Sequence, residues 1–206
     1  MYEVSQELLD IQNLYESALF DATKFPRAGS TNEKLLQFVD GAVENWRLLG
    51  SDPTVAKNLV QILYRATTKT FQSARIMRHL MYALEGSGES AEAERSLDAY
   101  LWIVDNEKKT LATSLHSAVK NPEQEGLVED IETDDEICRT MAAGIRLLVK
   151  YRKEGKKAFD MARSLEQRIQ IWKINDPEIL SSVWYAVGLA NSLWATQSNI
   201  LRNLWS

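Results

Sequence analysis

The chain has 206 residues and a formal net charge of −5; 45% of its residues are hydrophobic and 26% are charged. This balance is typical of a globular protein and excludes a disordered chain, while the acidic excess argues against a general nucleic-acid binder. The apolar runs are short and interrupted by charge, which argues against a membrane-spanning helix. Since Cys138 is the single cysteine and the first residues show no signal-peptide pattern, we expect an intracellular protein without an intrachain disulfide.

The spacing of apolar residues predicts eight helices, and no segment alternates apolar and polar residues over the length of a strand. The few glycine and proline residues fall between the helical patterns and mark their ends. In chain order, we expect helices at 5–24, 32–49, 53–66, 72–85, 91–118, 134–153, 156–172 and 177–206. The first of these carries one apolar face, made of Leu8, Ile11, Leu14, Tyr15 and Ala18.

Local signals place several of the helix ends. Asp52 and Pro53 predict the start of the third helix, because an Asp side chain can cap a helix and Pro is tolerated at the first helical position. We expect Ser30 or Thr31 to cap the second helix. Eight acidic residues and no basic residue lie between 123 and 136, so residues 121–133 are predicted to form a solvated acidic loop.

Three segments approximate the pattern of tetratricopeptide repeats, which are helix–turn–helix units of about 34 residues. Trp184 and Gly188 occupy the places of the repeat's first-helix motif, and Ala93 and Leu97 those of its second-helix motif. A third and looser copy begins at Gly144. The small residues of this motif allow two helices to approach closely while a large residue from the partner helix fills the remaining space.

These patterns predict an all-α fold in which antiparallel helix pairs stack as a tetratricopeptide-like α-solenoid of about eight helices. A plain antiparallel bundle is the alternative. We expect residues 1–206 to form a single helical-repeat domain. Because the last helical pattern reaches Ser206 without a stop signal, we also expect the chain to be a fragment of a longer solenoid.

The residues that carry catalytic chemistry are sparse. His79 and His116 have no second His or Cys at helical ligand spacing, so no metal site is predicted and each is interpreted as a satisfied surface or groove histidine. Cys138 follows three acidic residues, which raise a thiol pKa, and is interpreted as a buried structural cysteine. We therefore predict neither catalytic residues nor a cofactor.

A small basic and aromatic cluster is the candidate for partner binding. The first helix of a tetratricopeptide unit lines the concave face, and by that logic Arg75, Arg78, Tyr82 and Tyr185 are the predicted groove residues. A groove for acidic peptide is one interpretation of the basic residues around Arg75, and a solvated face with salt bridges is the other. A second basic cluster at 146–157 suggests either contact with an anionic membrane surface or a solvated helix end.

The segments 68–80 (TKTFQSARIMRHL), 92–101 (EAERSLDAYL) and 182–190 (SVWYAVGLA) resemble a fungal cargo-transport family. That family is similar to the animal tetratricopeptide repeat protein 7 family. The resemblance implies a non-enzymatic helical-repeat scaffold that bridges a phosphatidylinositol 4-kinase to a peripheral membrane anchor, with a link to endocytic traffic. It implies a cytoplasmic protein recruited to the inner face of the plasma membrane, with protein partners, no nucleic acid and at most indirect membrane contact.

Two other functions stay open at this stage. One is a generic tetratricopeptide-type peptide-binding adaptor with unrelated clients, which would bind a short peptide tightly in a basic or aromatic groove. The other is a helical enzyme domain, which would need a pocket with converging titratable groups.

Overall fold

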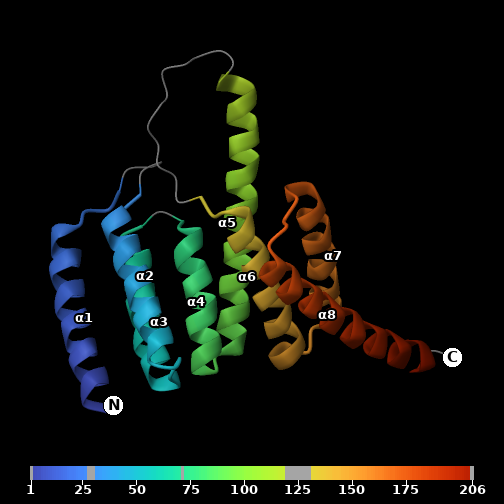
Figure 1. Cartoon of the computed structure of the whole chain (residues 1–206), viewed down its shortest axis with the longest axis horizontal. Helices are drawn as coiled ribbons and strands as arrows, with labels where there is room; N and C mark the ends of the chain where they lie inside the picture. The colour runs from blue at the N-terminus through green and yellow to red at the C-terminus, as the bar shows by residue number, and fades with distance from the viewer. Residues whose placement is uncertain (1, 27–30, 71, 119–130, 205–206) are drawn as a thin grey trace. The chain divides into compact units, whose positions relative to one another are not determined.

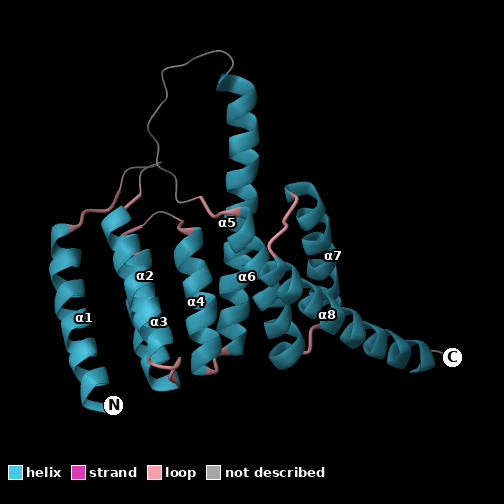
Figure 2. Ribbon diagram, in the orientation of Figure 1, coloured by secondary structure: helices cyan, strands magenta, loops and turns pink. Residues whose placement is uncertain are grey.

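The computed structural model describes residues 2–26, 31–70, 72–118 and 131–204. Regular structure within these residues is entirely helical (Figure 2), so the predicted all-α, solenoid-like fold is confirmed for them. The chain divides into two compact units, residues 1–131 and 132–206, which we describe separately. The single repeat domain over 1–206 stays a prediction. Of the predicted acidic loop at 121–133, residues 121–130 lie outside the described part, and residues 131–133 lead into a helix.

The helices agree closely in position with the sequence prediction. The first unit contains α1 (Tyr2–Ala22), α2 (Glu33–Leu48), α3 (Pro53–Thr67), α4 (Ala74–Ser87) and the long α5 (Ser90–Ala118). The second contains α6 (Asp134–Leu147), a π-helical turn η1 (Leu148–Arg152), α7 (Gly155–Trp172) and α8 (Pro177–Leu204). Within the described residues, no helix combines the length and hydropathy needed to cross a bilayer.

In the first unit, each helix runs antiparallel to the one before it and packs against its chain neighbours (Figure 1). The packing is continuous from α2 through α3 and α4 to α5. Its core consists of aliphatic side chains and one tyrosine that are almost completely buried: Leu35, Leu36, Leu59, Ile62, Leu63, Ile76, Leu80, Met81, Leu84, Leu97 and Tyr100. This succession of helix–turn–helix pairs is the arrangement expected of a helical solenoid.

The caps explain where the helices begin. The Asp52 carboxylate accepts hydrogen bonds from the backbone N–H groups of Thr54 (2.7 Å) and Val55 (3.2 Å), which confirms the predicted start of α3. Ser73 caps α4 in the same way through the N–H of Ile76 (3.2 Å). The N-cap of α2 is Asn32, without a side-chain cap hydrogen bond, so the prediction of Thr31 was wrong and Ser30 lies outside the described residues.

The turn after α4 lies later than predicted. Gly86 is still helical, and the helix ends at Gly88, whose φ of +87° is the left-handed conformation that glycine adopts without steric cost. A Cβ atom added at Gly86 would lie 2.5 Å from the Trp46 ring. Trp46 is itself buried and donates its indole N–H to the backbone carbonyl of Asp52 (3.1 Å). Because Gly86 has no side chain, the Trp46 ring of α2 can pack directly against the backbone of α4.

The packing of α1 differs from the one that its apolar periodicity suggests. Ile11, Leu14 and Tyr15 are exposed, whereas Glu16 is only 6% exposed. The Glu16 carboxylate accepts two hydrogen bonds from the Arg65 guanidinium of α3, at 2.7 and 2.8 Å. This bidentate ion pair satisfies the buried carboxylate and ties α1 to the solenoid.

In the second unit, α6, α7 and α8 pack against one another in all three pairs. The interfaces contain many small buried side chains, which allow the helix axes to approach closely. They are Ala142, Ala158, Ala162, Ala186 and Ala190. In the first unit, the predicted second-helix motif residues Ala93 and Leu97 are likewise inaccessible to solvent.

The first-helix motif of α8 does not pack as its resemblance to the repeat suggests. Trp184 is 52% exposed, and a Cβ atom added at Gly188 would meet no atom within 4 Å. The buried face of α8 is instead formed by Val183, Ala186 and Val187. Among the described residues, no helix therefore fills the space at Gly188, and this part of the packing interpretation was wrong.

Candidate partner-binding site

The predicted binding residues of the first unit share one side of α4. Arg75, Arg78, His79 and Tyr82 are spaced by three, four and seven positions, which places them on neighbouring turns of the same helix face. Arg75 and His79 both contact Asp40, so this side of α4 is turned toward α2. The Tyr82 ring continues the row and has the Arg47 guanidinium 6.0 Å from its centre.

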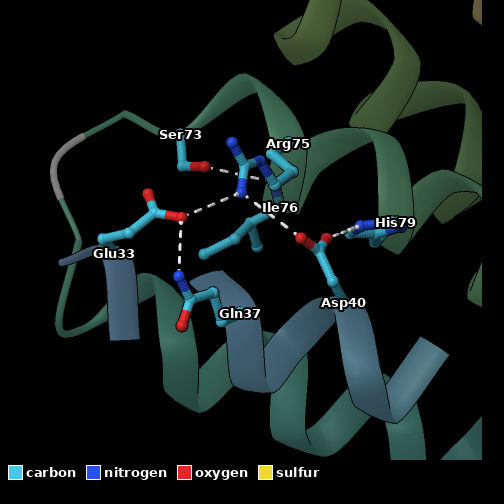
Figure 3. Close-up of polar contacts among 7 residues, drawn as sticks. All are labelled: Glu33, Gln37, Asp40, Ser73, Arg75, Ile76 and His79. Atoms are coloured by element: carbon cyan, nitrogen blue, oxygen red, sulfur yellow. Dashed lines mark hydrogen bonds and ion pairs between the residues drawn. The ribbon is translucent and has the colours of Figure 1, made fainter. Parts of the chain in front are cut away.

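Asp40 is the centre of a polar cluster between α2 and α4 (Figure 3). One carboxylate oxygen lies 2.8 Å from His79 Nε2 and the other 3.3 Å from Arg75 Nη1. The same Arg75 nitrogen lies 3.9 Å from the Glu33 carboxylate, which also accepts a hydrogen bond from Gln37 (3.3 Å). Burial raises the pKa of Asp40, but the His79 hydrogen bond and nearby positive charge outweigh it, so the pKa lies below its ordinary value.

His79 is a buried neutral base rather than the predicted surface or groove histidine. Its side chain is only 4% exposed, and burial lowers its pKa below 6.5 even though the hydrogen bond to Asp40 opposes this shift. Because ionised Asp40 accepts the hydrogen bond, the proton of the neutral ring lies on Nε2. Nδ1 is buried and has no hydrogen-bond partner, so a second proton there would have no acceptor.

This arrangement predicts a loss of stability in mildly acidic solution. Between its folded pKa and 6.5, His79 binds a proton in the unfolded chain but not in the folded chain, so the free energy of unfolding falls as the pH decreases through this range. His79→Gln preserves an N–H donor for Asp40 and removes the titration. We expect urea unfolding from about pH 7 to about pH 5.5 to show a weaker pH dependence for the variant than for the wild type. Equal pH dependence of the two proteins would contradict the assignment of a neutral buried His79.

The predicted basic patch is mostly engaged in contacts within the first unit. Arg75 is paired with acidic residues of α2, as the salt-bridge interpretation expects. Lys69 donates from Nζ to the backbone carbonyls of Phe20 (3.1 Å) and Thr23 (3.0 Å), where it stabilises the carboxyl end of α1. The role of Arg75, Arg78 and Tyr82 in partner binding stays a prediction.

Tyr185 belongs to the second unit, on α8, and is 62% exposed. Its neighbour Trp184 is also exposed, so two adjacent aromatic rings are accessible on this helix. Large exposed aromatic side chains are frequent anchors of protein interfaces. The sequence pattern favours Tyr185 as a contact residue and Trp184 as a packing residue, because a helical period does not show which aromatic side chain faces a neighbouring helix.

The acidic residues of the cluster between α2 and α4 were not predicted from the sequence. Glu33 and Asp40 are seven residues apart and therefore share a face of α2, which is a signal that could have been paired with the basic row of α4. The spacing within one helix does not show how α2 is aligned along α4. That alignment brings Asp40 into contact with His79 and Arg75.

Cys138 is the one cysteine, and the interpretation of a buried thiol is confirmed. Burial, with Asp134 and Asp135 adding to it, raises the pKa of this thiol from 9.0 to about 11. The thiolate population is therefore roughly 100-fold smaller than at the ordinary pKa. We expect Ellman's reagent at mildly alkaline pH to label the folded chain at least roughly 100-fold more slowly than the urea-unfolded chain. Comparable rates would contradict the buried environment.

Within the described residues, no three His, Cys, Asp or Glu side chains are grouped as ligands of a metal ion would be. Asp40 instead belongs to an ion-pair cluster that joins α2 to α4. The exposed aromatic rings of α8 are of the kind that is enriched in protein-contact surfaces. The fold of the described residues defines the class of the molecule: an all-α protein with solenoid-like helix packing.

Comparison with known proteins finds a distant relative. The chain is 25% identical over 193 residues to the putative cargo-transport protein ypp1 of Schizosaccharomyces pombe (strain 972 / ATCC 24843). The similarity covers 90% of the chain and 22% of that relative, so the chain spans about a fifth of the relative's length. No family model and no solved structure matches the chain. The resemblance to a fungal cargo-transport protein is confirmed at the level of a distant relationship.

Proposed function

We propose that this chain is a non-enzymatic adaptor in membrane traffic, which acts by holding other proteins on the surfaces of its helices. The observation that carries the proposal is similarity along 90% of the chain to a putative cargo-transport protein. Solenoid-like helix packing supports it, because stacked helices offer extended surfaces that suit scaffolds.

The more specific form of the proposal follows the resemblance of segments 68–80, 92–101 and 182–190. The adaptor bridges a phosphatidylinositol 4-kinase to a peripheral membrane anchor and thereby recruits the kinase to the inner face of the plasma membrane, with a link to endocytosis. Its own contact with the membrane is indirect. Tyr185 on α8 and the Arg75, Arg78 and Tyr82 side of α4 are the proposed contact residues. Exposure of Tyr185 and Trp184 supports the first of these surfaces.

Binding of each partner by the 206-residue chain tests the proposal. The purified helical region of the kinase and the carboxyl-terminal segment of the anchor are immobilised separately, and binding of the chain is followed by biolayer interferometry. We expect saturable binding to at least one of them, and a loss of about tenfold or more in affinity for Tyr185→Ala. Tyr151→Ala is the matched control, because Tyr151 is also an exposed tyrosine of the second unit (46%).

Arg75 is not suited to a charge-reversal test on its own, because Arg75→Glu would place a third acidic group beside Asp40 and Glu33. A folded chain that binds neither protein would refute the bridging proposal. Tight binding of short unrelated peptides, competed by neither protein, would favour the generic peptide-binding adaptor instead.

A further inference from the structure

Within the described residues of the first unit, α1 leaves an apolar stripe exposed. Ile11, Leu14 and Tyr15 are 65%, 75% and 55% exposed, and Ala18 is exposed as well. Their spacing of three, four and seven residues places them along one face of the helix. A contiguous apolar stripe of this kind on a surface helix is a mark of an interaction site rather than of isolated exposed residues.

The orientation of the stripe is set by polar contacts on the other side of α1. Glu16 forms its bidentate pair with Arg65, and Lys69 binds the carbonyls of Phe20 and Thr23 near the carboxyl end of the helix. A rotation that buried Leu14 would expose Glu16 and break these hydrogen bonds. These polar contacts therefore hold α1 in the orientation that leaves the stripe exposed.

A groove of about 560 Å³ runs beside the stripe, between α1 and α2. Ile11 and Tyr15 form its α1 side, and the Tyr15 ring lies 5.5 Å from that of Phe38 on α2. Gly41 also lines the groove, and a Cβ atom there would meet no atom within 4 Å. A residue without a side chain at this point lets the backbone of a bound helix approach closely. The shape fits recognition of a helix in a groove.

The charged residues of α1 indicate which charge a partner of this surface would carry. Helix α1 contains five acidic residues and no basic residue between Tyr2 and Ala22. Glu7 and Asp10 are exposed and lie one turn from Ile11 and Leu14, at the edge of the stripe. Lys34, near the start of α2, is the cation among the residues that line the groove. Glu16 is paired with Arg65, so the negative charge beside the stripe is that of Glu7 and Asp10, and it favours a cationic partner.

We propose that α1 and the groove beside it bind a basic amphipathic helix of a partner protein. The apolar face of that helix covers Ile11, Leu14 and Tyr15, and its Lys or Arg side chains lie against Glu7 and Asp10. This interaction surface is independent of the proposed kinase-bridging function.

Two other occupants fit less well. A second copy of α1 would bring like charges together. In the chain's own basic segment at 146–157, Leu147 and Leu148 are fully buried, which leaves Tyr151 as its exposed large apolar side chain. An anionic membrane surface would repel an acidic helix.

The test uses two synthetic peptides of roughly 18 residues, both with leucine on one helical face. One carries lysine on the opposite face, and the other carries glutamate at the same positions. Binding to the 206-residue chain is measured by fluorescence anisotropy. We expect the lysine peptide to bind and the glutamate peptide not to bind.

Variants of the chain locate the interaction. Leu14→Ser is expected to weaken binding of the lysine peptide by about tenfold or more, since it removes apolar contact area. Leu48→Ser is the matched control, because Leu48 on α2 is 77% exposed, and it should bind as the wild type does. Glu7→Lys combined with Asp10→Lys should reverse the preference and favour the glutamate peptide. Thermal unfolding followed by circular dichroism verifies that the variants fold, as expected for exposed positions.

Equal affinity of the wild type for both peptides, or unchanged binding by Leu14→Ser, would overturn the proposal. Sedimentation analysis tests whether a second copy of the chain covers the stripe, and flotation with vesicles containing phosphatidylserine tests whether a membrane does. Self-association or vesicle binding that Leu14→Ser abolishes would show that a second copy or a membrane covers the stripe, and would also overturn it.

Discussion

Gly86→Ala is expected to lower the free energy of unfolding by about 1–3 kcal/mol, although alanine is the better helix former. The added methyl group would lie 2.5 Å from the Trp46 ring, which is buried and held by its hydrogen bond to the carbonyl of Asp52. The ring cannot move aside without disturbing the contact of α2 with α4. Urea unfolding followed by circular dichroism measures the change.

Gly41→Ala is the matched control for this prediction. Gly41 is also a helical glycine, but a Cβ atom there would meet no atom within 4 Å. We expect this variant to gain about 0.5–1 kcal/mol, because alanine reduces the conformational entropy that the chain loses on folding. Opposite signs for the two substitutions would support the close packing of Trp46 on Gly86. A stabilised Gly86→Ala variant would contradict it.

Tyr100→Ala is expected to lower the free energy of unfolding by about 3–5 kcal/mol. Tyr100 has a fully inaccessible side chain on α5 and is the largest residue of that kind in the described core. Its removal leaves a cavity between packed helices and loses the transfer free energy of an aromatic ring. Thermal and urea unfolding of the whole chain should both report the loss.

Trp102→Ala provides the comparison from the same helix. Trp102 lies two residues further along α5 and is 56% exposed, so it faces a different side of the helix. We expect its replacement to change the free energy of unfolding by no more than about 0.5 kcal/mol. A loss as large as that of Tyr100→Ala would show that the burial of these two aromatic residues has been assigned incorrectly.

The positions of the helices could be predicted from the sequence because their determinants are local. The Asp52 carboxylate marks the start of α3 by accepting backbone hydrogen bonds within one turn, and Pro53 suits the first helical position. Apolar periodicity runs along each helix. The orientation of α1 could not be predicted in this way. Periodicity shows that Ile11 and Leu14 share a face, whereas the pairing of Glu16 with Arg65, 49 residues away in the sequence, determines which face is covered.

In the candidate site, too, features within one helix could be predicted from the sequence, whereas contacts between helices could not. Sequence spacing places Arg75, His79 and Tyr82 on one side of α4, and the structure agrees. Their environment depends on Asp40, which lies 39 residues before His79 and reaches it only through the packing of α2 on α4. Likewise, exposure of Trp184 depends on which helices surround α8, and that information is not contained in the local pattern.

The proposed bridging of two proteins by this chain is tested by a three-component binding measurement. The carboxyl-terminal segment of the anchor is immobilised, the 206-residue chain is loaded onto it, and retention of the phosphatidylinositol 4-kinase is recorded by surface plasmon resonance. We expect the kinase to be retained only after the chain has been loaded, and retention to fall when Tyr185→Ala replaces the wild type. Retention of the kinase to the same extent without the chain, or its absence from a surface loaded with folded chain, would contradict the bridging proposal.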